Sequence, residues 1–294
     1  MSQQTTELGQ REPRATGIAR WRSLLLRVCR GIEDDRILAT AGGVAFFILL
    51  AIFPGLAGVI SLYGLIADRH TVSEHLGLLA GLLPEGGLEI IRDQLEKLTS
   101  QPAPRLGLAT IAGLAFSLWS ANGGVKAMFD ALNVAYEVRE KRGFVALNLV
   151  SIALTLGATG FMILSLLAIA VVPEGLAWAG WSRASAVFGG LRWPILFVLA
   201  SLGIATIYRF GPSRDRPRWR WISPGTVFAT VAWVATSVMF SWYTEHFGSY
   251  DKTYGSLGAV VGFMTWLWIS TIVILAGAKL DAERERDVKV QTGS

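Results

Sequence analysis

Lys126 and Asp130 lie four residues apart, which places their side chains on one face of a helix. Asn122 and two glycines precede Lys126, and Tyr136 follows Asp130 by six residues. One interpretation is a polar pocket at the inner leaflet, where Lys126 contacts an anionic headgroup. The other is the solvated end of a helix, with an ion pair between Lys126 and Asp130.

A second polar group consists of Tyr250, Asp251 and Tyr254, in a short segment between two apolar ones. We take these three side chains as candidates for substrate binding. Gly258 and Gly262 lie four residues apart, with Gly255 one turn earlier. Small residues at this spacing let helices approach closely, so we expect the three glycines to serve helix packing.

Pro54 interrupts the first long apolar segment of the chain. Proline removes a backbone donor and kinks a helix. The kink either serves packing or marks a discontinuous helix that lines a cavity, and Pro54 is therefore a further substrate-binding candidate. A row of small or hydroxyl-bearing residues that includes Thr226, Thr230 and Ser237 presents a similar choice. It either packs against the last apolar helix or lines a polar groove.

The sequence contains none of the familiar catalytic patterns. It has three His and one Cys, too few and too scattered for a metal cluster. Neither the P-loop pattern nor the GxSxG nucleophile elbow occurs. We therefore expect no enzyme activity, no catalytic residue, no metal site and no cofactor.

The composition is typical of an integral membrane protein. Hydrophobic residues make up 52% of the 294 residues and charged residues 17%, against about 25% in soluble domains. A helix that crosses a bilayer core of about 30 Å needs about 20 apolar residues. The predicted fold class is all-α, a polytopic membrane protein with six transmembrane helices, at about 38–67, 106–125, 143–173, 186–208, 221–244 and 253–278.

The basic residues predict the orientation of these spans. Of the 27 Lys and Arg residues, 20 fall in the two tails and in the second and fourth connections, and seven in the other three connections. By the positive-inside rule both termini are cytoplasmic. Because the basic residues flank apolar spans, we interpret them as contacts to anionic lipid headgroups and expect no nucleic-acid partner.

The predicted domain organisation has three parts. Residues 1–37 form a cytoplasmic tail with an amphipathic helix, 38–280 the membrane domain and 281–294 a second cytoplasmic tail. In the first outside connection, 68–105, apolar residues recur at helical spacing between charged ones. We expect an amphipathic helical hairpin there, which either caps the bundle or acts as a lid or docking element.

Several motifs occur in a particular order along 32–285. They are Ala41–Phe47 with Phe53-Pro54, the stretch Trp119–Phe144, Ser223-Pro224-Gly225, Tyr243, Tyr254–Gly258, Trp266 and Leu275–Leu280. Together they resemble the YihY/BrkB family of bacterial inner-membrane proteins. The resemblance implies six spans with cytoplasmic ends, and links the chain to virulence factor BrkB-like proteins, envelope integrity and lipid or lipopolysaccharide traffic. Many members carry the name ribonuclease BN, which we reject here on the chemistry above. Relatives often have Ser where this chain has Ala51-Ile52.

These observations favour a multi-pass protein of the bacterial inner membrane that transports or flips a lipid or another amphipathic envelope component. The expected partners are membrane lipids and envelope proteins, and the sequence indicates no oligomeric state. The alternative function is a non-transporting scaffold for envelope assembly. The candidate substrate-binding residues are Pro54, Asn122, Lys126, Asp130, Tyr136, Tyr250, Asp251 and Tyr254.

Overall fold

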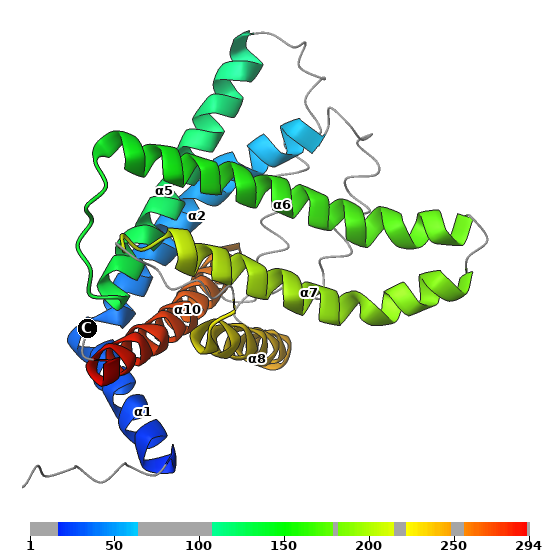
Figure 1. Ribbon diagram of the computed structural model, residues 1–294. Helices are drawn as coiled ribbons and strands as arrows, with labels where there is room; N and C mark the ends of the chain where they lie inside the picture. Colours follow the sequence, from blue (N-terminus) through cyan, green and yellow to red (C-terminus); the bar gives the residue numbers. More distant parts are fainter. Residues whose placement is uncertain (1–16, 64–107, 179–181, 215–221, 248–255, 293–294) are drawn as a thin grey trace, which may run out of the picture.

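The described part of the chain is entirely helical. The computed structural model describes residues 17–63, 108–178, 182–214, 222–247 and 256–292 (Figure 1). These ranges contain seven helices and no strand, which confirms the predicted all-α class. The helices are α1 (Gly17–Asp34), α2 (Ile37–Tyr63), α5 (Leu108–Ala135), α6 (Phe144–Trp178), α7 (Ser182–Phe210), α8 (Pro224–Phe247) and α10 (Ser256–Thr292).

Each predicted span overlaps one of the six helices from α2 to α10. Three described segments are long and apolar enough to cross a membrane: Phe144–Phe161, Pro224–Thr244 and Val260–Val288. The count of six spans therefore stays a prediction. The predicted hairpin at 68–105 lies outside the described residues.

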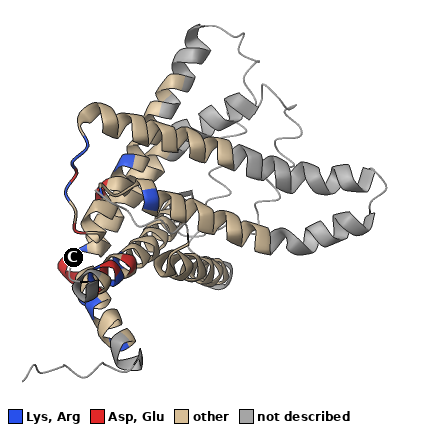
Figure 2. Ribbon diagram, in the orientation of Figure 1, with Lys and Arg blue, Asp and Glu red and all other residues tan. Residues whose placement is uncertain are grey.

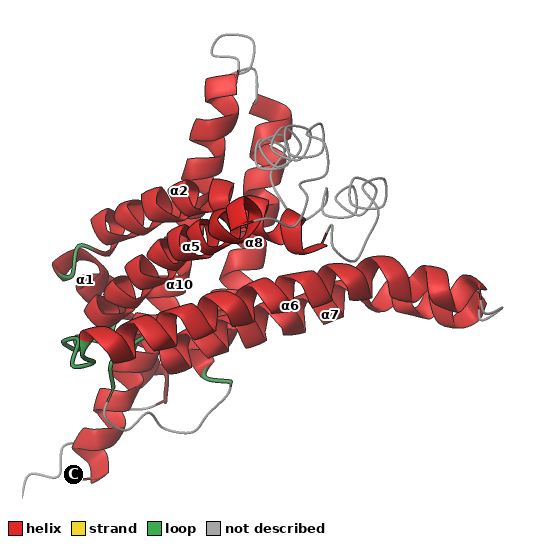
Figure 3. Cartoon of the chain, turned by 90° about the horizontal axis from the view of Figure 1, so that it is seen from above, coloured by secondary structure: helices red, strands yellow, loops and turns green. Residues whose placement is uncertain are grey.

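The helices form two groups. α2 packs against α5, and α10 contacts α8, α2, α1 and α5. α6 and α7 lie side by side as a pair and extend beyond the other helices (Figures 1 and 3). The pair joins the rest of the molecule through contacts of α6 with α5 and of α7 with α8.

Among the described residues, many of the charged positions lie at one end of the ribbon, around the C-terminal part of α10 (Figure 2). The largest buried apolar cluster lies nearby, with Ile37 of α2, Leu132 of α5 and Leu275 of α10 packed together. α5 continues past its predicted end to Ala135 because its last turns are buried in this cluster, Leu132 and Ala135 being fully covered.

α8 begins at Ser223-Pro224-Gly225, close to the predicted start of the fifth span at about residue 221. Ser223 Oγ accepts a hydrogen bond from the backbone N–H of Thr226 at 3.0 Å, which is the N-cap arrangement. Pro224 occupies the first helical position, where its missing N–H costs nothing. Asp281 of α10 accepts from the backbone N–H of Gly225 at 2.8 Å and from the Ser223 hydroxyl, and so fixes α8 against α10.

The first part of α6, Phe144–Phe161, is mostly uncovered by the rest of the described protein. Only 11% of its apolar segment Phe144–Phe161 is buried. Phe144, Val145 and Leu149 are 82%, 69% and 64% exposed. An uncovered apolar helix of this length suits contact with lipid rather than with water.

Candidate functional site

The predicted residues Asn122 and Lys126 both lie on the side of α5 that contacts α6. Lys126 Nζ donates to Asn148 Oδ1 at 2.6 Å. Thr155 Oγ1 lies 3.3 Å from Asn122 Oδ1 and donates to the carbonyl of Ser151 at 2.8 Å. The Lys126 amine is thus bound to a neighbouring helix, and Asn122 is buried with 1% of its surface exposed.

These five residues form a polar seam between α5 and α6. Asn148, Ser151 and Thr155 recur at intervals of three and four residues and share one face of α6. Ser151 and Thr155 are buried, 0% and 5% exposed, within a helix whose other faces are apolar and uncovered. We use the name α5–α6 seam for Asn122, Lys126, Asn148, Ser151 and Thr155. Asn122 and Lys126 of α5 are among the residues predicted from the sequence, whereas the three residues of α6 are not.

Tyr136 lies apart from the seam, beyond the end of α5. Its ring packs edge-on against Tyr208, with ring centroids 6.5 Å apart, and the Arg214 guanidinium stacks over it at 4.4 Å from the centroid. Tyr136 is buried and Asp130 is exposed. The structure therefore separates Asn122 and Lys126 from Tyr136, although all lie in one sequence stretch.

Several other predicted residues lie wholly or partly outside the described structure. Tyr250, Asp251, Tyr254 and Gly255 lie outside the described residues. α2 continues through Pro54 to Tyr63, and the surroundings of the Pro54 side chain are outside the described part.

The expected packing glycines can be compared with the observed close approach of helices. Among the described residues, a Cβ built at Gly262 would meet no atom within 4 Å, and the packing role of Gly258 and Gly262 stays a prediction. The closest approach lies instead between α8 and α10: a Cβ at Gly225 would lie 2.2 Å from the Gly277 carbonyl oxygen.

The polar row on α8 packs against its neighbours. Trp233 Nε1 donates to Ser270 Oγ, and Trp266 Nε1 donates to Ser237 Oγ, each at 3.1 Å. Thr230 accepts from Ser201 of α7 at 3.2 Å. These contacts favour the packing interpretation of the row over the polar groove.

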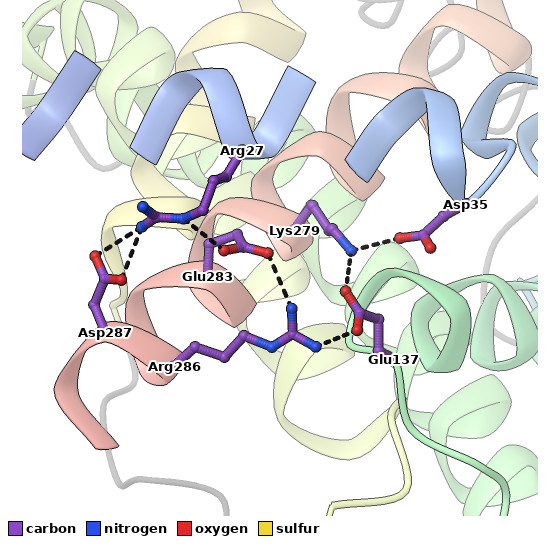
Figure 4. Close-up of polar contacts among 7 residues, drawn as sticks. All are labelled: Arg27, Asp35, Glu137, Lys279, Glu283, Arg286 and Asp287. Atoms are coloured by element: carbon purple, nitrogen blue, oxygen red, sulfur yellow. Dashed lines mark hydrogen bonds and ion pairs between the residues drawn. The ribbon is translucent and has the colours of Figure 1, made fainter. Parts of the chain in front are cut away.

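An ion-pair network that sequence reasoning does not identify joins α1, the end of α5 and α10 (Figure 4). Lys279 of α10 has a side chain only 2% exposed, and its amine contacts Asp35 and Glu137. Arg286 contacts Glu137 and Glu283, and Arg27 binds Glu283 and Asp287. A Cβ at Gly31 would lie 2.3 Å from Lys279 Cε, so α1 passes closely over this lysine. The pairs that join Arg27 and Asp35 to α10 are separated by 244 to 260 positions, and those that join Glu137 to α10 by 142 and 149, so no local pattern reveals them.

Glu137 stands at the point where α5 ends, in a backbone conformation with φ 53°. Glycine normally takes this left-handed position after a helix because it has no Cβ to strain. The backbone strain of a glutamate at this position is offset by the contacts of its carboxylate. The hydrogen bond from Lys279, together with that from Arg286, holds the pKa of Glu137 below its ordinary value.

A second charged arrangement holds the segment between α5 and α6 against the end of α7. Arg142 forms a two-pronged pair with Glu140 at 2.8 and 2.7 Å and donates to the carbonyl oxygens of Phe210 and Gly211. Its hydrogen bonds lower the pKa of Glu140 to about 2. Asn133 bridges the two segments, donating to Glu140 and accepting from the backbone N–H of Ser213. None of Asn133, Glu140 and Arg142 is among the predicted site residues.

The described residues contain no group of three or more His, Cys, Asp and Glu placed to hold a metal ion. The arrangement that they do present is a polar seam between α5 and the largely uncovered segment Phe144–Phe161 of α6, with arginine side chains held in place near the start of α6. Such an arrangement can bind and orient a polar, anionic group next to apolar surface.

The chain matches the family described as Virulence factor BrkB over residues 28–293. It is similar to the ribonuclease-like protein YfkH of Bacillus subtilis, with 30% identity over 81% of this chain and 86% of the relative. It is also similar to a UPF0761 membrane protein of Tolumonas auensis, with 25% identity over 86% and 82%, and to one of Vibrio vulnificus, with 26% identity over 92% and 84%. No solved structure matches the chain. Because the family match covers nearly the whole chain, including the seam, the ion-pair network and the Arg142 segment, the protein belongs to the virulence factor BrkB family of membrane proteins.

Proposed function

We propose that this protein spans the bacterial inner membrane six times, with both termini in the cytoplasm, and moves a lipid or another amphipathic envelope component across the bilayer. The observation that carries the proposal is the α5–α6 seam. A buried row of polar groups inside an apolar helix pair is expensive unless those groups have a use, because each must be satisfied away from water.

The geometry of α6 suits a molecule with a polar and an apolar end. From Asn148 to Thr155 the polar face rises by about 10 Å, at about 1.5 Å per residue. Leu149, Ile152 and Leu156 follow the same periodicity on the neighbouring face and are 64%, 44% and 49% exposed. A headgroup that passes along the polar face would keep its acyl chains beside these residues, in the lipid.

The seam is closed in this structure. Thr155 binds Asn122, and Lys126 binds Asn148, so the polar groups satisfy one another. Transfer then requires α5 and α6 to separate, with the headgroup replacing these contacts. Because only 11% of the apolar segment of α6 is buried, few packing contacts oppose such a movement.

The positions of the described charges support the proposed orientation. The network brings α1 and the end of α10 together, and Arg214, after α7, binds Glu285 of α10 at 2.9 Å. Arg142 joins the connection before α6 to the same end. The four basic segments that the charge count assigns to one side of the membrane thus meet at one end of the molecule, and the positive-inside rule makes that end cytoplasmic.

The test is transbilayer movement of lipid in vesicles reconstituted with the purified protein. Dithionite should quench a fluorescent phospholipid beyond the outer-leaflet half, which protein-free vesicles do not allow. Thr155→Val should slow this phase about tenfold, since an unsatisfied headgroup contact costs about 1–3 kcal/mol.

Thr230→Val is the matched control, because Thr230 is an equally buried threonine that bonds its own helix and a neighbouring one. It should leave the rate unchanged. Quenching that stops at the outer-leaflet half for phospholipids of each headgroup class would contradict the proposal and favour the scaffold function.

We also propose that the chain is not a ribonuclease, although YfkH is named ribonuclease-like. The support is the absence of a catalytic motif from the sequence. Incubation of RNA with protein purified to homogeneity, with and without Mg²⁺ or Zn²⁺, should give no cleavage. Cleavage that copurifies with the protein through every step would overturn this expectation.

A further inference from the structure

A cleft of about 350 Å³ opens where α6 begins and α7 ends. The residues that line it are Lys141, Arg142, Val150, Arg209, Phe210, Pro212, Ser213 and Arg214. Four of these eight are cationic, and none of the described residues that line the cleft is acidic. Its size is that of a small-molecule site, and its charge selects an anion.

Two of the four cations are fixed in place by the protein itself. Arg142 is held by Glu140 and by the carbonyl oxygens of Phe210 and Gly211, at 2.6 to 2.9 Å. Arg214 donates to the carbonyl of Tyr208 at 2.7 Å and to Glu285 at 2.9 Å, and its guanidinium lies over the Tyr136 ring. A ligand would therefore meet guanidinium groups whose ordering is already complete, which favours affinity.

The walls of the cleft are fixed as well. Ser213 accepts from the backbone N–H of Lys141 at 3.1 Å and donates its own backbone N–H to Asn133. Gly211 has no room for a side chain, because a Cβ there would lie 2.5 Å from the Ile207 carbonyl oxygen. The connection before α6 and the turn after α7 are thus held together on both sides of the cleft.

One donor in the cleft lining has no acceptor. Arg214 Nε is buried and lacks a hydrogen-bond partner among the described residues. Leaving a buried charged donor unsatisfied is costly, so such groups require an explanation. This atom has almost no accessible surface, so it is not among the donors that a ligand in the cleft would meet directly.

We propose that this cleft binds a phosphate group. Phosphate offers several anionic oxygens that suit the planar donors of Arg, and a Lys adds a point charge. Both a phospholipid headgroup and inorganic phosphate carry this chemistry. Val150 of the cleft lies in the same turn of α6 as Asn148 and Ser151 of the seam, so the cleft and the seam both lie near the start of this helix. That the bound phosphate belongs to the transported molecule rests on the function proposed above; the binding itself does not.

The experiment is isothermal titration of the full-length protein in a neutral detergent with two probes, inorganic phosphate and dihexanoyl phosphatidylglycerol. The double variant Lys141→Gln with Arg209→Gln removes two charges from the cleft and leaves the structural Arg142 and Arg214 intact. It should weaken binding at least about tenfold, as expected for lost charge-assisted hydrogen bonds. Arg139→Gln, in the same connection but outside the cleft lining, should bind like the wild type.

Each outcome assigns a meaning to the cleft. Binding of the lipid alone identifies a headgroup, and binding of inorganic phosphate alone identifies a soluble ligand; both support the proposal when the double variant loses them. No binding of either probe by the wild type overturns it, as does equal binding by the double variant and Arg139→Gln. Should the double variant misfold, Lys141→Arg with Arg209→Lys retains the charges and must retain binding.

The two proposals can fail separately. A wild-type protein that binds phosphate but moves no lipid would support phosphate binding in the cleft and contradict the transport function. A wild-type protein that moves lipid but does not bind phosphate would support the transport function and contradict phosphate binding in the cleft.

Discussion

The contacts of the Glu137 side chain compensate for the unfavourable conformation of its backbone. Its left-handed conformation, φ 53°, costs a residue with a Cβ about 1 kcal/mol. Its carboxylate contacts Lys279 and Arg286, and without it the buried Lys279 amine would keep only Asp35. A buried cation that loses a partner destabilises the fold more than the strain does.

Two substitutions at this position separate strain from charge. Glu137→Gly should destabilise the protein because the ion pairs are lost, and Glu137→Ala should destabilise it by about 1 kcal/mol more because the strain remains. Chemical unfolding in detergent measures both. Equal stabilities of the two variants would show that the backbone relaxes at no cost.

Glu140 predicts a pH dependence of stability. Its pKa is about 2 in the folded protein, against an ordinary 4.5, because Arg142 and Asn133 bond the carboxylate. A lowered pKa stabilises the fold above the ordinary value, and the contribution is lost as the pH falls toward the folded value.

The measurement compares the melting temperatures of wild type and Glu140→Gln. The difference should be constant from about pH 7 to about pH 5 and shrink between about pH 4.5 and about pH 2. A difference that does not change over that acid range would mean that Glu140 keeps its ordinary pKa.

The sequence predicts the polar residues inside the apolar segments better than the polar residues in the connections between them. Lys126 and Asn122 stand out because polar residues inside an apolar stretch are conspicuous. Asn133, Glu140 and Arg142 do not stand out, because polar residues in a connection are ordinary until the Gly211 turn is placed beside them.

At the scale of elements, hydrophobic runs predict the helices well and the contacts between them poorly. The six predicted spans match helices because long apolar runs have few alternatives. The close approach of α8 and α10 depends on Gly225 and Gly277, which are 52 positions apart and belong to no spacing motif. The conspicuous Gly258–Gly262 pair leaves open space at Gly262 in the described structure.

This contrast is testable with one methyl group. Gly277→Ala would place a Cβ 2.6 Å from the Gly225 carbonyl oxygen, so α8 and α10 must move apart, at a cost of about 1–3 kcal/mol. Gly262→Ala meets no atom within 4 Å and should leave the melting temperature unchanged or raise it. A Gly277→Ala protein as stable as the wild type would show that this helix contact is loose.

At the scale of the whole molecule, the charged ends of α1, α5, α7 and α10 meet on one side (Figure 2). The apolar parts of α6 and α8 extend away from that side with much of their surface uncovered. This division into a charged end and an apolar body is what the proposed orientation requires, with the charged end in the cytoplasm and the apolar body in the bilayer.

The single cysteine tests the orientation. Cys29 is exposed on α1 and lies near Arg27 of the ion-pair network. A membrane-impermeant maleimide should leave Cys29 unlabelled in intact spheroplasts and label it after permeabilisation. Cys29→Ser with Thr71→Cys, in the predicted first outside connection, should show the opposite pattern. Labelling of Cys29 from outside would reverse the proposed orientation.

The span of the ion-pair network has a consequence for biosynthesis. Arg27 and its partners Glu283 and Asp287 are separated by 256 and 260 positions, so the contact forms only after nearly the whole chain has left the ribosome. Until then the first helix carries arginines without their acids, at a time when earlier spans are already inserting. A chain that ends before Glu283 would lack both acids of Arg27 and would hold α1 less firmly against proteases. Synthesis through Asp287 is therefore a condition for securing a helix made more than 250 positions earlier.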